Sequence, residues 1–218
     1  HTRYPLVTGV QTCALPILGY AALCVDMYGK GKRGATPEEN SALMTPLVQD
    51  RALLRRRTEA ALAHLRSLPM VDGDRIGAIG FCFGGLCAFD LARYGIAGVR
   101  GCVGFHGLLG APERVERAKA MHTRVLALHG WNDPMARPEA VNAFAREMHD
   151  HGADWQVHAF GGCGHAFTNP AAQDAKGGMH FNTLADARSF ALMRDFFAEV
   201  FGDAWNTRVT ACPWPGCP

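Results

Sequence analysis

Short apolar runs alternate with longer amphipathic segments along most of the chain. Four runs have the length of a buried strand: 21–25, 76–79, 101–105 and 124–128. Residues 155–160 alternate large with small or polar residues, which also predicts a strand. Apolar or charged residues at helical spacing occupy the stretches between and after them: 45–65, 86–93, 112–121, 139–149 and 184–201. Strands that alternate with helices predict an α/β fold, in which helices cover both faces of a mostly parallel sheet.

The two ends of the chain lack this alternation. Residues 1–17 show neither the two-residue period of a strand nor the 3.6-residue period of a helix, and they contain Pro5 and Pro16. We therefore expect a non-native or disordered segment there. The sheet is therefore expected to lack the first strands of its fold. Residues 207–218 are predicted to be a Pro- and Cys-rich tail, which leaves one domain over residues 18–206.

Composition supports an ordinary globular protein. The chain has 218 residues, of which 48% are hydrophobic and 19% charged, which suits a single domain with a sizeable core. A formal net charge of +2 gives no indication of a nucleic-acid or anionic-membrane partner. No apolar run is long enough to span a membrane. We expect a small-molecule substrate, no nucleic acid, no membrane, and a monomer or homodimer.

The cysteines argue for a reducing compartment. Of eight cysteines, Cys24, Cys82, Cys87 and Cys102 lie in or beside apolar patterns of a mid-sized chain. That placement favours free thiols and a cytoplasmic location. The Cys and His spacings fit no zinc site, and we expect neither a metal nor an organic cofactor.

One stretch carries the clearest chemistry. An apolar strand from Ile76 is followed by Gly80-Phe81-Cys82-Phe83-Gly84-Gly85 and then by a helical pattern. The form G-x-C-x-G is that of a nucleophile elbow, with a thiol at its tip and a helix N-terminus that favours the thiolate. A buried structural cysteine and a dinucleotide-binding turn are the alternatives. The absence of G-x-G-x-x-G after the first complete strand argues against nucleotide binding.

Two further residues follow later strands in the order typical of α/β-hydrolases, nucleophile, acid and histidine. Asp133 lies in a turn-rich loop and His165 in a glycine-rich loop. In this hypothesis His165 activates the thiol, Asp133 orients the imidazole, and the Phe83 N–H binds the oxyanion. Asp133 could equally be a turn residue before proline. Asp26 precedes the elbow, and we expect it to anchor its own loop.

Several segments together resemble the dienelactone hydrolases (carboxymethylenebutenolidases). They are the elbow itself and the segments Val25-Asp26-Met27-Tyr28-Gly29, Phe105-His106-Gly107 and Gly164-His165-Ala166-Phe167. The resemblance covers about residues 18–202. It implies an α/β-hydrolase fold, a Cys82, His165 and Asp133 triad, and hydrolysis of small esters or lactones. In this family the typical substrates are dienelactones, and many members are esterases.

The resemblance also implies features that this sequence lacks. The family carries an early strand with a His-Glu loop that supplies a second oxyanion donor, and residues 1–17 contain no match to it. The Phe83 N–H is then the expected oxyanion donor, and weak activity is expected. Bulky residues beside the elbow predict a pocket for small acyl or lactone groups, with these candidate walls: Phe81, His106, Trp131 and Phe167. The alternative is a non-catalytic or inactivated binding protein of the same fold.

Overall fold

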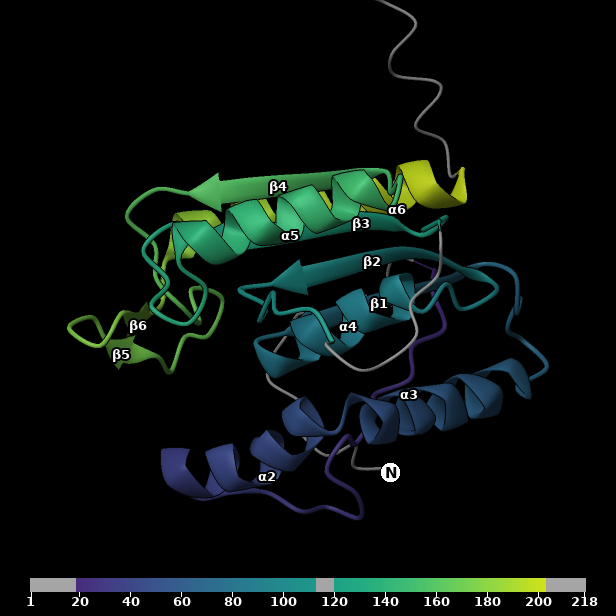
Figure 1. Cartoon of the computed structure of the whole chain (residues 1–218), viewed down its shortest axis with the longest axis horizontal. Coiled ribbons are helices and arrows are strands. Elements are labelled where there is room, and N and C mark those ends of the chain that lie inside the picture. The colour runs from purple at the N-terminus through teal and green to yellow at the C-terminus, as the bar shows by residue number, and fades with distance from the viewer. Residues whose placement is uncertain (1–18, 113–119, 203–218) are drawn as a thin grey trace, which may run out of the picture.

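Four strands pair in sequence order, β1-β2-β3-β4, into one parallel sheet (Figure 1). The computed structural model describes residues 19–112 and 120–202. The strands are β1 (Ile76–Phe81), β2 (Val99–Phe105), β3 (Arg124–Gly130) and β4 (Trp155–Phe160). All four were predicted, β4 with the same bounds, and β1, β2 and β3 are each two residues longer than their apolar runs suggested.

Helices cover both faces of the sheet, as the alternating pattern predicted. They are α2 (Pro37–Gln49), α3 (Arg51–Arg66), α4 (Phe83–Arg93), α5 (Pro138–Asp150) and α6 (Thr183–Phe201). In Figure 1, α4 and α5 lie in front of the sheet and α6 lies behind it. None of the helices that the structure describes combines the length and apolar character needed to cross a membrane.

Alternate residues of the strands supply two separate cores, because successive side chains point to opposite faces. On one face Cys102 and Val125 pack with Phe89 of α4 and Phe144 of α5. The other face holds residues of β2, β3 and α6: Val103, Phe105, Leu126, Leu128, Met193, Phe196 and Phe197. The sheet is thus buried on both sides, which explains why its central strands read as continuous apolar runs.

The predicted strand over 21–25 is wrong. These residues form no strand and are exposed, with 36% of Leu23 and 41% of Val25 accessible to solvent. The segment starts at Tyr20, whose ring packs against Phe197 and Phe201. An apolar run becomes a buried strand only where neighbouring elements cover its two faces, and the elements that the structure describes leave residues 21–25 exposed.

The predicted helix over 45–65 is two helices. Asp50 separates them: its side chain accepts from the Leu53 N–H at 2.8 Å, while its own N–H donates to the Pro46 carbonyl at 2.9 Å. The first of the two, α2, begins earlier than predicted, after Thr36, whose hydroxyl accepts from the Glu39 N–H. Thr36 with Glu39 three residues later is a capping-box pattern that could have located this start.

A small hairpin between β4 and α6 was not predicted. It consists of β5 (Gln173–Asp174) and β6 (Met179–His180), which pair antiparallel. Its strands are too short to show alternation in the sequence. The predictions for residues 1–17 and 207–218 lie outside the described residues, as does most of the predicted helix over 112–121.

Candidate active site

Cys82 lies at the tip of a strained turn between β1 and α4. Its φ of 53° and ψ of −118° place a non-glycine residue in a sparsely populated backbone region. The turn is fixed from the end of β2, because the Cys82 N–H donates to the Phe105 carbonyl at 3.0 Å. The Cys82 carbonyl accepts from the N–H groups of Gly85, at 3.0 Å, and Leu108, at 3.3 Å. The elbow is therefore held by neighbours on both sides of the thiol.

Two glycines make this turn possible. A Cβ on Gly80 would lie 1.9 Å from the Gly84 carbonyl oxygen, and one on Gly85 would lie 2.7 Å from Gly107 Cα. A Cβ on Gly84 would meet nothing within 4 Å. The steric requirement expected for the glycines on both sides of Cys82 thus falls on Gly80 and Gly85, and Gly84 does not share it.

Asp133 and His165 come together beyond the carboxyl ends of β3 and β4. His165 Nδ1 lies 2.7 Å from Asp133 Oδ2, and both residues are almost fully buried. The other carboxylate oxygen of Asp133 accepts from the Met135 N–H at 2.8 Å. His129 also ends β3, but neither of its ring nitrogens has a hydrogen-bond partner among the described residues. The acid therefore bonds to the histidine that chain order predicted.

The two buried groups favour each other's charged forms. Burial lowers the pKa of His165, but the side chains of Asp133 and Cys82 outweigh it and raise this pKa to about 9. Burial raises the pKa of Asp133, but the hydrogen bond and charge of His165 leave it below its ordinary value. At neutral pH the pair is an imidazolium and a carboxylate.

The second ring nitrogen of His165, Nε2, is the one available to the Cys82 thiol. Nε2 is buried and makes no hydrogen bond of regular geometry within the described part of the chain. Cys82 is half-buried and lies near enough to raise the His165 pKa. With Nδ1 committed to Asp133, Nε2 is the atom left to exchange a proton with the thiol.

The hairpin that sequence reasoning missed holds the acid and histidine loops together. The His165 N–H donates to the Gly178 carbonyl at 2.7 Å. A Cβ on Gly178 would approach Pro134 Cδ at 2.9 Å, and one on Gly164 would lie 2.0 Å from the Gly178 oxygen. The geometry of the pair thus depends on three backbone segments packed in contact. The glycines of these loops can be seen in the sequence, but no sequence pattern indicates that the loops would come into contact.

The four predicted pocket residues occupy different places. His106 is buried, its ring meets that of His165 edge-on with centroids 5.0 Å apart, and its Nε2 lies 2.9 Å from Thr168 Oγ1. Burial, then the charge of His165, lower the His106 pKa to about 3, so this ring is neutral. Phe81 stacks on Phe105, and Phe167 has no exposed surface.

Trp131, the fourth of them, is 47% exposed. That these four residues line a substrate pocket stays a prediction. Phe83 begins α4, where an N–H has no partner within the helix. Asp26 anchors its loop as expected, since its carboxylate accepts from the N–H groups of Tyr28, Gly29 and Gly31.

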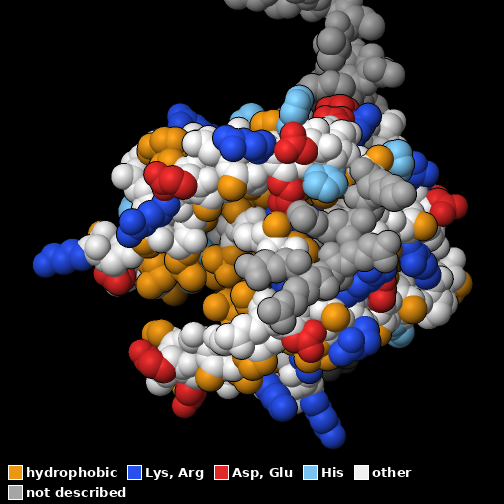
Figure 2. Space-filling view, viewed as in Figure 1, with side chains coloured by type: hydrophobic (Ala, Val, Ile, Leu, Met, Phe, Trp, Pro, Cys, Tyr) orange, Lys and Arg blue, Asp and Glu red, His pale blue; other side chains and the backbone are white. Residues whose placement is uncertain are grey.

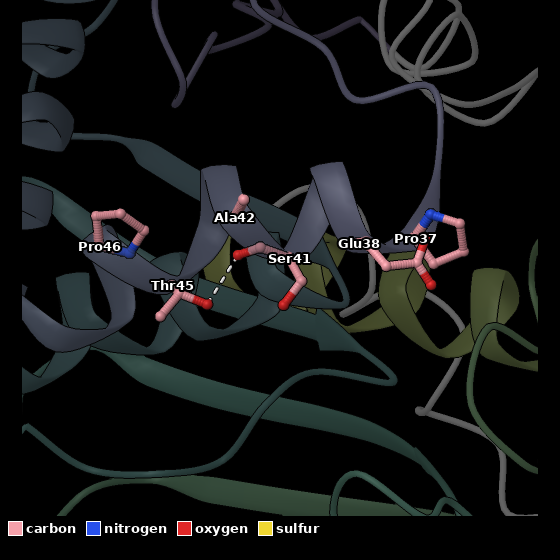
Figure 3. Close-up of a pocket in the computed structure, with 6 residues that line it drawn as sticks. All are labelled: Pro37, Glu38, Ser41, Ala42, Thr45 and Pro46. Carbon is pink, nitrogen blue, oxygen red and sulfur yellow. Dashed lines mark hydrogen bonds between the residues drawn. The ribbon is translucent and has the colours of Figure 1, made fainter.

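A groove of about 630 Å³ runs along α2, away from these residues (Figure 3). Its lining comes from that helix: Pro37, Glu38, Ser41, Ala42, Thr45 and Pro46. The Thr45 hydroxyl already donates to the Ser41 carbonyl at 2.7 Å. Within the described ranges, no group of three or more His, Cys, Asp or Glu residues is arranged to hold a metal ion. The candidate chemistry therefore lies at the elbow.

Comparison with known proteins identifies the family and the fold. The model of the dienelactone hydrolase family matches residues 12–201. The chain belongs to this family. Its fold, a mostly parallel sheet with helices on both faces, is that of the α/β-hydrolases.

Similar proteins extend the comparison for this dienelactone hydrolase family member. A solved structure named m3DLH is 44% identical, with a TM-score of 0.78 over 85% of this chain and 77% of its own. A dienelactone hydrolase-like promiscuous phosphotriesterase from metagenomic libraries is 38% identical, with the same TM-score and coverage. A carboxymethylenebutenolidase of a Pseudomonas species is 31% identical over 140 residues, 58% of this chain and 56% of that protein.

Proposed function

We propose that the protein hydrolyses small, uncharged or weakly polar carboxylic esters or lactones through a Cys82, His165 and Asp133 triad. The observation that carries this proposal is the 2.7 Å bond between buried His165 and Asp133, beside a thiol on a strained elbow. Membership of the dienelactone hydrolase family supports the reaction class. The similarity to a protein named carboxymethylenebutenolidase supports a lactone or ester substrate.

The first half of the reaction acylates the thiol. In the reactive form His165 Nε2 already holds the proton of Cys82, and the sulfur attacks the carbonyl carbon as a thiolate paired with the imidazolium. The carbonyl oxygen becomes an oxyanion, which the Phe83 N–H at the start of α4 stabilises. The bond from this carbon to the ester oxygen then breaks, and the leaving alkoxide takes the proton from His165. The products are a thioester on Cys82 and an alcohol, or an open chain that carries both in the case of a lactone.

The second half returns the enzyme to its starting state. His165 removes a proton from water as the hydroxide attacks the thioester carbon. Collapse of this second oxyanion releases the carboxylic acid and the Cys82 sulfur as a thiolate, and the proton taken from water stays on His165, as in the starting state. Asp133 stays ionised throughout, keeps Nδ1 protonated and stabilises the imidazolium. We propose that this hydrolysis takes place in the cytoplasm and uses neither a metal nor an organic cofactor.

A second candidate reaction uses the same thiol on phosphorus. The 38% identical structure is that of a promiscuous phosphotriesterase, which favours testing phosphotriesters here. A thiolate would attack the phosphorus atom, the bond to an aryl oxide leaving group would break, and water would release the phosphodiester. Ester hydrolysis remains the main proposal, because it needs no group beyond the triad and the oxyanion donor.

The two cysteines of the elbow region provide a matched test. Cys87 lies on α4 and is buried, and burial raises its pKa to about 12. We expect Cys82→Ala to abolish hydrolysis of p-nitrophenyl acetate, while Cys87→Ala keeps most of the turnover. His165→Ala should be inactive as well. Equal activity in Cys82→Ala and wild type would reject the triad, and absence of activity in folded wild type would favour a non-catalytic binding protein.

A further inference from the structure

An apolar wall packs with the candidate nucleophile against one hydrophobic cluster. We define it by four side chains: Tyr28, Met44, Val48 and Leu108. These residues are all half-buried, and they pack with Cys82 against one hydrophobic cluster. Their partial exposure means that each presents apolar surface to solvent beside the thiol. None was predicted as a pocket residue from the sequence.

The chain brings this wall together from three places. Tyr28 comes from the loop that Asp26 anchors, and its ring stacks on Phe83 with centroids 6.0 Å apart and planes 6° apart. Leu108 follows β2, and its N–H donates to the Cys82 carbonyl. Met44 lies on α2. The wall is thus tied to the elbow backbone at two points, through Phe83 and through Leu108.

The side formed by α2 is loosely held. Among the 13 residues of this helix only Leu47 is buried. Figure 2 shows a hollow between the α2 region and the body of the molecule, with hydrophobic side chains gathered inside it. Met44, with its flexible thioether side chain, can adjust to groups of different shape.

The apolar, uncharged character of the wall determines which chemical group it can bind. The four side chains of the wall carry no charge, and the guanidinium of Arg57, which lies close by, already donates to the Met27 carbonyl. Burial, then the nearby Cys82 and Cys87, raise the pKa of the Tyr28 phenol, so this side chain is neutral as well. A carboxylate placed here would lose hydration without gaining a cation, whereas an aromatic ring or a short branched alkyl group would release water from apolar surface.

We propose that Tyr28, Met44, Val48 and Leu108 form the subsite that binds the uncharged apolar group of the substrate, with α2 as its adjustable side. The inference rests on the proposed function in taking Cys82 as the atom to which the substrate becomes joined. It predicts a preference for aryl or branched-alkyl esters over substrates that carry a carboxylate. Tyr28 is then a specificity-determining residue that touches the substrate and takes no part in proton transfer.

Alkylation of single cysteines tests the subsite without requiring turnover. The probes are N-methylmaleimide, N-phenylmaleimide and the negatively charged N-(2-carboxyethyl)maleimide, with each labelled cysteine quantified by peptide mass spectrometry. Exposed Cys24 gives the intrinsic reactivity of each probe within the same molecule. In wild type we expect Cys82 to favour the phenyl over the methyl probe by about tenfold more than Cys24 does, and to react slowest with the charged probe.

The variants then separate the wall from the rest of the site. Tyr28→Ala and Met44→Ala should bring the phenyl preference of Cys82 down toward that of Cys24, whereas Tyr28→Phe should keep it. Met70→Ala, at a 71% exposed position, is the matched control and should change nothing. Circular dichroism confirms folding. An unchanged preference in both Tyr28→Ala and Met44→Ala, or a preference for the charged probe, would overturn the subsite.

Ester kinetics distinguish this inference from the function on which it rests. With p-nitrophenyl acetate and p-nitrophenyl phenylacetate, Tyr28→Ala should lower kcat/KM for the phenylacetate about tenfold more than for the acetate. Equal losses on both esters, with turnover still dependent on Cys82, would overturn the subsite and leave the triad. A phenyl preference in labelling without any Cys82-dependent turnover would reject the triad and leave the subsite.

Discussion

His165 Nδ1 and Asp133 Oδ2 lie 2.7 Å apart although the residues are 32 positions apart in the sequence. Both side chains are buried, so the ion pair forms where water screens it little. The loop after β3 supplies the acid and the loop after β4 supplies the histidine. Because the folded structure raises the pKa of His165 and lowers that of Asp133, the protonation of the pair is coupled to folding.

Stability should fall with rising pH on account of His165. Its folded pKa of about 9 exceeds the ordinary value of 6.5, so the folded state holds more protons between these values. This contribution is complete below about pH 6.5 and is lost as pH rises through about 9; it amounts to roughly 3 kcal/mol. Urea unfolding across this range should show the loss in wild type and a smaller one in His165→Gln. Parallel curves for the two proteins would contradict the assignment.

The contact of the hairpin with the acid loop gives a second prediction. Gly178 and Gly162 both have positive φ, 75° and 73°, but only a Cβ on Gly178 would collide with Pro134. Replacing either glycine by alanine therefore adds similar backbone strain, of order 1 kcal/mol. We expect Gly178→Ala, and not Gly162→Ala, to lower kcat for p-nitrophenyl acetate at least about tenfold. Equal kcat values in the two variants would show that the hairpin does not position the pair.

The sheet and the elbow could be predicted because their signals are local. Strands β1 to β3 contain apolar runs, β4 alternates large with small or polar residues, and the turn after Ile79 carries its own glycines. The bond between Asp133 and His165 followed from a rule of topology, since parallel strands place their carboxyl ends at one edge. No single residue type revealed it.

The wrong and missing predictions share a cause. Each of these features depends on contacts between residues that are far apart in the sequence. Residues 21–25 have strand-like composition but lack the covering elements that would bury them. The hairpin is fixed by backbone contacts such as that between Gly164 and Gly178, which no spacing displays. Tyr28 and Met44 were missed as neighbours of Cys82 because helix α2 was expected to begin eight residues later, at Thr45.

Two glycines of the elbow, Gly80 and Gly84, give a third prediction, in which Gly84 serves as the control. Gly80→Ala would force a Cβ against the Gly84 carbonyl, whereas Gly84→Ala meets open space in α4. We expect Gly80→Ala to lower the free energy of unfolding by about 1–3 kcal/mol or more. Gly84→Ala should be neutral or gain up to about 1 kcal/mol, because alanine favours helix. Urea denaturation measures both, and similar losses in the two variants would mean that the close approach at Gly80 is relaxed.

A buried charge network joins the helices beneath the elbow. Asp90 of α4 accepts from Arg51 of α3 at 2.8 and 3.0 Å and from Arg93 at 3.1 Å. Arg93 in turn pairs with Glu147 of α5 at 2.9 Å. Asp90 is 2% exposed and Arg93 has no exposed surface. Asp90 thus contacts both buried guanidinium groups, and its loss removes the carboxylate that pairs with Arg51, whereas Arg93 keeps Glu147.

Asp90→Ala should be among the most destabilising single substitutions in this chain. It leaves Arg51 and Arg93 buried without their shared carboxylate, and removing one partner of a buried pair costs about 3–5 kcal/mol. The control is Glu59→Ala, which breaks the half-exposed pair with Arg55 on α3 and should cost only about 0.3–0.5 kcal/mol. Chemical denaturation gives both values. A loss below about 1 kcal/mol in Asp90→Ala would mean that solvent reaches the two arginines, and that the network does not hold α3 and α5 against α4.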